Sequence, residues 1–168
     1  MTPIFRFAVI LGAAWSVLAV PFQANARNLV EMAKDSGSFK QLLRAIDLAG
    51  LTPALSNEGP FTLFAPTDEA FAKLPKAAVD DLLLPHNKDK LSKVLRHHLL
   101  SGLVISRDFS GKRLEAIPLS GDALLLDART QPKIATAKIV RSDLLADNGV
   151  IHVIDTVLIP SFDELVKK

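Results

Sequence analysis

The sequence predicts an α+β fold, and three observations lead to that class. Apolar residues recur at helical spacing through the first half of the chain, whereas the second half contains short apolar runs separated by turn residues. Near the C-terminus a longer run is apolar on both alternating sets of positions, as a strand buried on both faces would be. We therefore expect one domain in which helices pack on a mostly antiparallel sheet.

The first 26 residues have the layout of a secretory signal peptide. Arg6 supplies a positive charge, residues 7–20 form an apolar stretch too short to span a membrane comfortably, and Ala24-Asn25-Ala26 forms a small-residue cleavage site. The C-terminal residues are too polar for a second anchor. We expect cleavage after Ala26, a single domain over residues 27–168, and a soluble product that is secreted or periplasmic.

Composition disfavours several classes of function. The chain has no cysteine, and therefore neither a disulfide nor a thiol nucleophile. Residues 1–26 hold one arginine and no acidic residue, so the net charge of the rest of the chain is one unit below the +2 of the whole sequence. A net charge this close to zero disfavours nucleic-acid binding. Trp15 leaves with the signal peptide and the chain has no tyrosine, so only phenylalanines remain to stack on a sugar or a base.

Four helices are expected from apolar spacing in the first hundred residues. The first helix contains Leu29, Met32 and Ala33, and the second runs from Phe39 to Ala49 and is closed by Gly50. The third contains Val79, Leu82 and Leu83, and the fourth contains Leu91, Val94, Leu95 and His98. The last of these stripes places a histidine on the apolar face of its helix.

Strands are expected where short apolar runs lie between turn residues. A buried strand runs from Phe61 to Ala65, and further runs cover residues 103–105, 114–117, 123–126, 134–135 and 138–140. The strongest run covers residues 149–160, after the tight-turn signal Asp147-Asn148-Gly149. This last run should form a central strand, because it is apolar on both faces.

Thr67, Asp68 and Glu69 lie between the first buried strand and the apolar residues Ala70, Phe71 and Leu74. A threonine side chain can cap the first free amides of a helix, and carboxylates in its first turn are favoured by the helix dipole. A catalytic carboxylate pair would instead need a partner acid or base, which the sequence does not identify. We interpret the three residues as a capped helix start.

The histidines give no metal-ligand pattern. His97 and His98 are adjacent, so on a helix their side chains point about 100° apart, and neither His86 nor His152 has a second ligand at a typical spacing. No nucleophile elbow or phosphate-binding glycine loop is present. We expect no metal, no cofactor and no enzymatic activity. Because a buried polar ring needs a partner, His98 should form a hydrogen bond near the helix start at Thr67 or near the final strand.

Two stretches, FTLFAPTDEAFAKLP and DNGVIHVIDTVLIP, resemble the two signature segments of the fasciclin domain family. Between them, LRHHLLSG is similar to the family's short Tyr-His segment, with His98 in the histidine place and His97 where the family usually has tyrosine. The resemblance covers nearly all of residues 27–168. The positions that match its motifs structurally are Phe64, Pro66, Thr67, Asp68, Asn148, Gly149, His152 and Pro160.

The resemblance implies a twisted β-sandwich or wedge packed with several helices, and a role in adhesion without catalysis. In animal members, integrin recognition has been tied to an Asp-Ile pair just ahead of the second signature segment, and Asp143 and Leu144 occupy the places of that pair. With His97 and His98, they are the candidate binding residues. The simpler alternative is a short polar turn that directs Leu144 and Leu145 into the core.

We therefore expect an exported, non-enzymatic protein that mediates cell adhesion or extracellular or envelope association through a protein partner. The alternative is a carrier, since some members of the family bind carotenoids or other lipidic molecules in an apolar cleft. The expected partner is a cell-surface, matrix or envelope protein, and the protein itself is expected to be a monomer.

Overall fold

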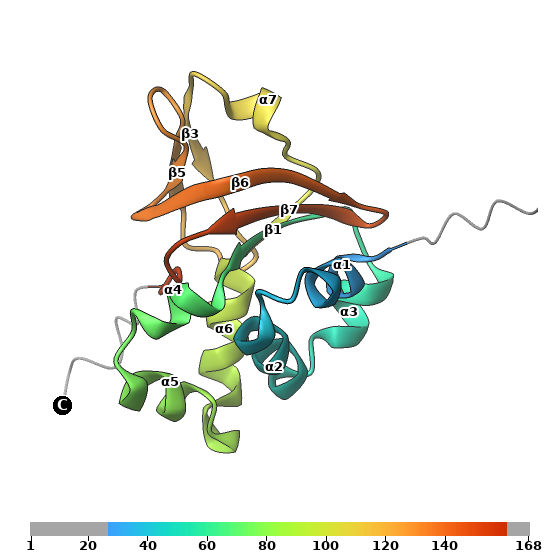
Figure 1. Cartoon of the computed structure of the whole chain (residues 1–168), viewed down its shortest axis with the longest axis vertical. Coiled ribbons are helices and arrows are strands. Elements are labelled where there is room, and N and C mark those ends of the chain that lie inside the picture. Colours follow the sequence, from blue (N-terminus) through green and yellow to red (C-terminus); the bar gives the residue numbers. More distant parts are fainter. Residues whose placement is uncertain (1–26, 161–168) are drawn as a thin grey trace, which may run out of the picture.

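A computed structural model describes residues 27–160 and shows helices on one side of a central group of strands (Figure 1). The predicted signal peptide lies outside these residues. Within residues 27–160, no helix has both the length and the apolar character needed to cross a membrane. The smaller strands and one short helix lie on the opposite side of the central strands (Figure 1).

The helices of the first hundred residues are amphipathic and have identifiable ends. They are α1 (Leu29–Ser36), α2 (Lys40–Ala49), α3 (Thr52–Asn57), α4 (Asp68–Ala72), α5 (Lys76–Leu82), the 3-10 helix η1 (Pro85–Asn87) and α6 (Lys88–His97). A further short helix, α7 (Ser106–Phe109), follows later in the chain. The side chain of Asn28 caps α1, and Gly37 and Gly50 end α1 and α2 in left-handed conformations that glycine adopts without a steric penalty.

The helix start at Thr67 is confirmed. The Thr67 hydroxyl accepts a hydrogen bond from the Ala70 amide at 3.2 Å, as the cap interpretation requires. Asp68 has an additional contact, because its carboxylate accepts hydrogen bonds from the amides of Lys40 and Gln41, at 3.3 and 2.8 Å. The same carboxylate therefore caps α2, whose own N-terminal residue, Phe39, provides no side-chain cap.

The strands form one mixed sheet with the order β2-β1-β7-β6-β5-β4-β3. Their bounds are β1 (Phe61–Pro66), β2 (Leu99–Ser101), β3 (Arg113–Ala116), β4 (Leu124–Asp127), β5 (Lys133–Ile134), β6 (Ala137–Ala146) and β7 (Gly149–Ile154). β1 and β7 pair in parallel, and the other neighbours pair antiparallel, so the sheet is mostly antiparallel as expected. All six residues of β7 are buried, which confirms its central position.

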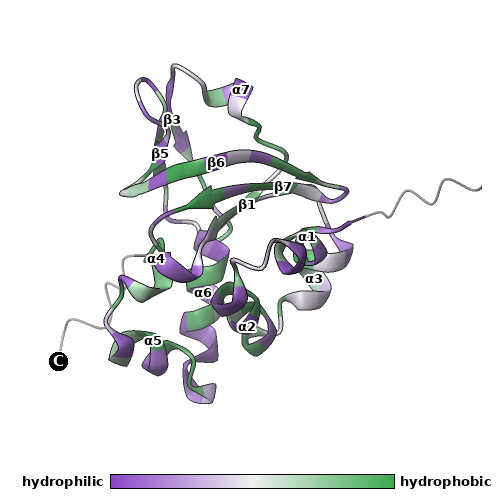
Figure 2. Cartoon of the chain, viewed as in Figure 1, coloured by the Kyte–Doolittle hydropathy of each residue, from purple (hydrophilic) through white to green (hydrophobic). Residues whose placement is uncertain are grey.

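The sheet separates two hydrophobic cores. The helices cover one face, where Leu42, Ile46, Leu95 and Ile151 share a core. On the other face, Phe64 and Ile154 of the central strands pack against residues of the outer strands, among them Leu126 and Ile134. The two ends of the sheet thus enclose the second core between them, in the manner of a sandwich. Apolar residues follow the central strands and the inner sides of the helices (Figure 2).

Several predicted elements differ from the observed ones. The strand expected at residues 103–105 is wrong: the strand β2 lies earlier, at Leu99–Ser101, and residues 103–105 form a connection into α7. The final strand ends at Ile154 rather than at residue 160. Val157 and Leu158 are buried as expected, but they belong to a segment that does not pair with another strand. Helix α3 was not expected, since Leu55 is its only fully buried residue. His98 is the residue that caps the end of α6, not a position within it.

Candidate functional site

Asp143, the first candidate binding residue, lies at a bulge in β6. The pairing register between β6 and β7 shifts twice, between Ile139 and Arg141 and again between Arg141 and Leu144. Asp143 has a φ of 60°, a left-handed conformation that aspartate tolerates better than most residues. The expected polar turn is therefore wrong in detail: the residue lies within a strand, at a position where extra residues bend the backbone.

The Asp143 carboxylate is partly buried and is held by the first residue of α7. It accepts hydrogen bonds from the Ser106 amide, at 2.8 Å, and from the Ser106 hydroxyl. Partial burial would raise the pKa of Asp143, but the two hydrogen bonds from Ser106 outweigh it and leave that pKa below its usual value. The ionised carboxylate thus fixes the start of α7 against the bulge and is not a free ligand for a partner.

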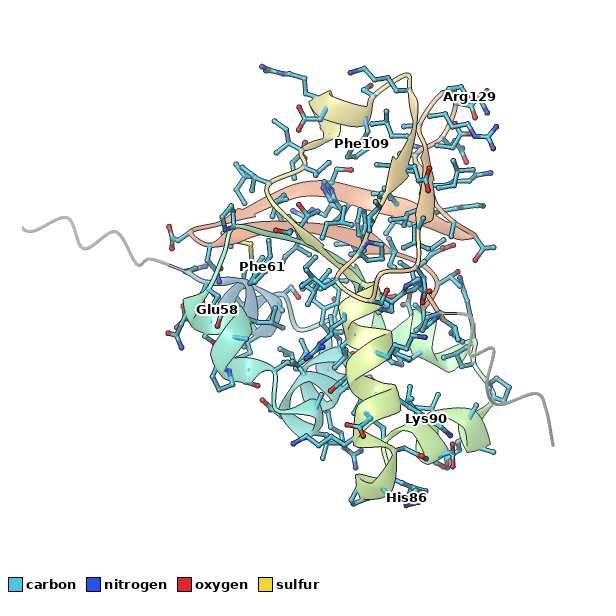
Figure 3. The ribbon with its side chains drawn as sticks, turned by 180° about the vertical axis from the view of Figure 1, so that it is seen from behind. Glu58, Phe61, His86, Lys90, Phe109 and Arg129 are labelled. Carbon is cyan, nitrogen blue, oxygen red and sulfur yellow. The ribbon has the colours of Figure 1, made fainter. Side chains whose placement is uncertain are left out.

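His152 lies beneath this contact and is completely buried. Its Nε2 atom lies 2.8 Å from the Val104 carbonyl oxygen, and the Asp143 amide donates to its Nδ1 atom across 3.4 Å. Since Nδ1 accepts, the proton of the neutral ring is on Nε2 and is donated to Val104. The ring stacks on Phe64 with centroids 5.4 Å apart and meets Phe109 edge-on at 5.5 Å. Phe109 lies on the side of the sheet away from α6 (Figure 3).

We call Asp143, Ser106, His152 and Val104 the bulge cluster. It brings a serine, a histidine and an aspartate together, but not in the order that nucleophilic catalysis requires. The serine hydroxyl donates to the carboxylate instead of to the imidazole, and both ring nitrogens of His152 already have backbone partners. Burial lowers the pKa of His152, with the Val104 carbonyl opposing the shift, so the ring is neutral at neutral pH. The arrangement is suited to positioning backbone segments.

His98, the second of the histidine candidates, joins two distant segments of backbone. Its Nδ1 atom lies 2.8 Å from the Val94 carbonyl oxygen, and its Nε2 atom accepts a hydrogen bond from the Leu158 amide at 2.9 Å. The hydrogen bond expected near the final strand is therefore confirmed, four residues beyond the end of β7. Burial lowers the pKa of His98 to about 4, against the opposing effect of the Val94 carbonyl.

His97 is also buried, and its Nδ1 atom lies 2.8 Å from the hydroxyl oxygen of Ser120. Burial lowers the pKa of His97, although nearby Asp122 opposes the shift. With exposed fractions of 3% and 1%, neither His97 nor His98 is presented at the surface. Both rings hold loops in place.

The turn before β7 connects the two signature segments. Asn148 accepts a hydrogen bond from the Leu29 amide at 2.9 Å and donates to the carbonyl oxygens of Leu55 and Glu58, at 2.7 and 2.9 Å. Gly149 has no room for a side chain, because a Cβ atom there would lie 2.2 Å from the carbonyl oxygen of Phe61. Of the other motif residues, Phe64, Pro66 and Pro160 are buried, which agrees with a structural role.

The accessible part of this region is the later part of β6, beyond the residues that pair with β5. Of the residues of β6, only Ala137 and Lys138 pair with β5, so the later residues of β6 have β7 as their strand partner. Leu144 is half-buried and packs against the helical core, but Leu145 is 60% exposed and Val140 is 59% exposed. The expectation that both leucines enter the core is thus wrong for Leu145. We call these exposed side chains, Val140, Arg141 and Leu145, the β6 surface, which reaches both faces of the strand because Arg141 pairs with Val153 and Leu145 pairs with Val150.

The described part of the chain contains no group of three or more histidine, aspartate or glutamate residues placed to hold a metal ion. Comparison with known proteins instead points to a family. The sequence profile of the fasciclin domain matches residues 37–160. The chain belongs to the fasciclin domain family.

Several relatives extend this result. Protein sll1483 of a Synechocystis strain is 43% identical over 137 residues, which cover 81% of this chain and 75% of the relative. The transforming growth factor-beta-induced protein ig-h3 of Sus scrofa is 34% identical over 79% of this chain, but the match spans only 19% of that longer protein. This fasciclin chain therefore corresponds to a small part of the animal relative.

A solved structure confirms the fold class. The chain resembles a fasciclin domain pair from the insect cell adhesion molecule fasciclin I, with a TM-score of 0.54 and 16% identity, over 74% of this chain and 46% of the solved one. The α+β fold with a mixed sheet and several helices is therefore the fasciclin fold.

The contacts of Ser106 and Val104 were missed from the sequence. Ser106 lies 37 residues from Asp143, and Val104 lies 48 residues from His152, so no local spacing indicates either contact. The one available signal was His152 itself, a histidine in an otherwise apolar strand, which needs hydrogen-bond partners when buried.

Proposed function

We propose that this fasciclin chain is an exported, non-enzymatic interaction protein that contributes to adhesion or to matrix or envelope association. The observation that supports this best is the contrast between the bulge cluster and the β6 surface. The polar groups of the cluster are hydrogen-bonded to one another and partly or fully buried, whereas Val140 and Leu145 of the same strand as Asp143 are exposed. Exposed apolar residues that gather in one region can mark a site of protein interaction.

The proposed contact lies at the β6 surface, next to Asp143 and Leu144. Asp143 serves it indirectly, since its carboxylate fixes the bulge from which Val140, Arg141 and Leu145 project. The partner is a protein of the cell surface, matrix or envelope, consistent with the role of fasciclin I as a cell adhesion molecule. The alternative of a carotenoid or lipid carrier gains no support from the comparisons.

Gene deletion and complementation test this proposal. Cells that lack the gene should attach less well to surfaces or to one another, and the wild-type gene should restore attachment. Leu145→Arg should fail to restore it, because a charge replaces an apolar contact. Leu125→Arg on β4 is the matched control, since Leu125 is also a partly exposed leucine in the same sheet, with an exposed fraction of 39%.

The two parts of the proposal can fail separately. Unchanged attachment after deletion would reject the adhesion role altogether. Equal restoration by both leucine variants would instead retain the adhesion role and reject the β6 surface as the contact.

A further inference from the structure

The strand β3 ends the sheet and is exposed along its length. Arg113, Leu114 and Glu115 are exposed, and Leu114 has an exposed fraction of 38% although it faces Leu126 of the second core across the pair. β3 lies at the end of the molecule opposite the helices α2 and α5 (Figure 1). An unpaired edge strand presents free amides and carbonyl groups that can pair with another strand.

The hydrogen-bond pattern shows which backbone groups are free. The Ala128 amide donates to the Lys112 carbonyl oxygen at 2.8 Å, and on the far side of β4 the Ala135 amide donates to the Leu125 carbonyl oxygen at 2.7 Å. Partners alternate along an antiparallel strand, so the backbone groups of Leu114 face β4. Those of Arg113 and Glu115 therefore point away from the sheet.

The other edges of the sheet are less suited to pairing. The outer side of β2 is covered, because the Leu119 amide donates to the Leu99 carbonyl oxygen at 2.8 Å and Leu100 bridges to Pro118. The free side of β6 is bent by its two register shifts, and bulges of this kind hinder edge pairing. The pairing of β3 with β4 has no register shift, so β3 is straight and regular.

We propose that β3 pairs with β3 of a second copy of this chain, antiparallel about a two-fold axis through Leu114. In this register Arg113 lies opposite Glu115 of the second copy, and Glu115 lies opposite its Arg113. Each charged side chain thus faces a side chain of opposite charge. The amides and carbonyl groups of Arg113 and Glu115 are also the ones that face outward, so these residues can form the hydrogen bonds between the two copies.

The neighbouring residues fit the same arrangement. Arg113 is already paired across the sheet with Asp127, so in the dimer it lies between two carboxylates. Leu114 meets Leu114 of the second copy, and both exposed side chains become covered. A four-residue edge buries less than the roughly 1,200 Å² typical of stable interfaces, so the dimer forms at high protein concentration and not as an obligate unit. This differs from the monomer expected from the sequence.

Sedimentation equilibrium of the purified, exported protein over a range of concentrations tests this proposal. The wild-type protein should show a concentration-dependent approach to the dimer mass. Arg113→Glu and Glu115→Arg each place like charges opposite one another, and each should weaken the dimer by at least about tenfold. Both residues are exposed, so circular dichroism should show an unchanged fold. Arg107→Glu in α7 is the matched control for loss of an exposed positive charge outside β3 and should leave the dimer unchanged.

Mixing the two single variants gives the sharper result. The Arg113→Glu copy then offers two acids to the two cations of the Glu115→Arg copy, so the mixture should dimerise at concentrations at which neither variant does so alone. A monomer at every wild-type concentration would overturn the proposal and mean that the charges on β3 prevent edge association. A dimer that persists in either single variant, or a mixture that stays monomeric, would also overturn it.

Discussion

At the scale of single residues, Asp143 has a structural role that the sequence did not indicate, whereas His98 has the role that the sequence predicted. Asp143 was expected to contact a partner, and its carboxylate instead accepts two hydrogen bonds from Ser106. His98 was expected to be buried with a partner, and it is, because an apolar helix stripe was sufficient to indicate burial. The difference is that burial follows from local spacing, whereas a contact across 37 residues does not.

Asp143→Ala should destabilise the protein by roughly 1–3 kcal/mol. The substitution leaves the Ser106 amide and hydroxyl without their acceptor and places alanine at a φ of 60°. Urea denaturation followed by circular dichroism measures the change. Asp143→Asn is the matched control, because asparagine keeps an acceptor and tolerates this φ, and it should cost less. A stability of the alanine variant equal to wild type would contradict the role of the carboxylate.

At the scale of elements, the turn between β6 and β7 connects helices and sheet. Its tight-turn sequence was recognisable, but its hydrogen bonds to α1 and to the end of α3 were not, since α3 itself was not expected. Likewise, the spacing of apolar residues predicted β1 and β7 as buried strands. It gave no indication that they pair in parallel, because that pairing joins segments separated by most of the domain.

Asn148→Asp should destabilise the protein by roughly 2–4 kcal/mol. The amide nitrogen of Asn148 donates to two carbonyl oxygens, and a carboxylate oxygen in its place would face them without a proton. Thermal unfolding measured by calorimetry detects this loss. Asp147→Asn at the neighbouring exposed position is the control and should change stability by less than about 0.5 kcal/mol. Equal effects of the two substitutions would argue against the bridging role of Asn148.

Gly149→Ala should cost more than about 3 kcal/mol, because the added Cβ atom would lie 2.2 Å from the Phe61 carbonyl oxygen and β1 would have to move away from β7. Gly37→Ala controls for the loss of a glycine. Gly37 has a φ of 69° and no atom near the added Cβ, so Gly37→Ala should lower the free energy of unfolding by only about 1 kcal/mol, through backbone strain. Denaturant midpoints for both variants provide the comparison, and a smaller loss at Gly149 than at Gly37 would be inconsistent with this packing.

At the scale of the whole molecule, folding buries three histidine rings, and this burial makes stability depend on pH. His98 has its pKa lowered to about 4 in the folded protein from an ordinary value of 6.5. Between these values the unfolded chain binds more protons than the folded one, so stability is complete above pH 6.5 and falls as the pH decreases towards 4. His97 and His152 are shifted in the same direction by burial.

The free energy of unfolding should therefore decrease by roughly 3 kcal/mol from His98 alone as the pH falls through this window. Urea titrations at several pH values measure the change. His98→Gln should be less stable at neutral pH and should show a shallower decrease on acidification, because one titrating ring is absent. An identical slope in wild type and variant would contradict the assignment to His98.

The fold class and the capped helix start could be predicted from the sequence because both depend on local spacing and on signature segments. The exposed β6 surface could not, because each register shift adds one residue to β6 relative to β7, and the sequence of residues 137–146 does not mark where these extra residues lie. Leu145 illustrates this directly, since the alternative interpretation of the sequence placed it in the core and it is 60% exposed.

The central claim is that the protein acts by binding through the β6 surface. Its most direct test is the binding of labelled, purified protein to the surface of intact cells of its own source. We expect saturable binding that unlabelled wild-type protein and Leu125→Arg displace, and that Leu145→Arg displaces at least about tenfold less well. Absence of saturable binding, or equal displacement by Leu145→Arg and wild type, would contradict the claim.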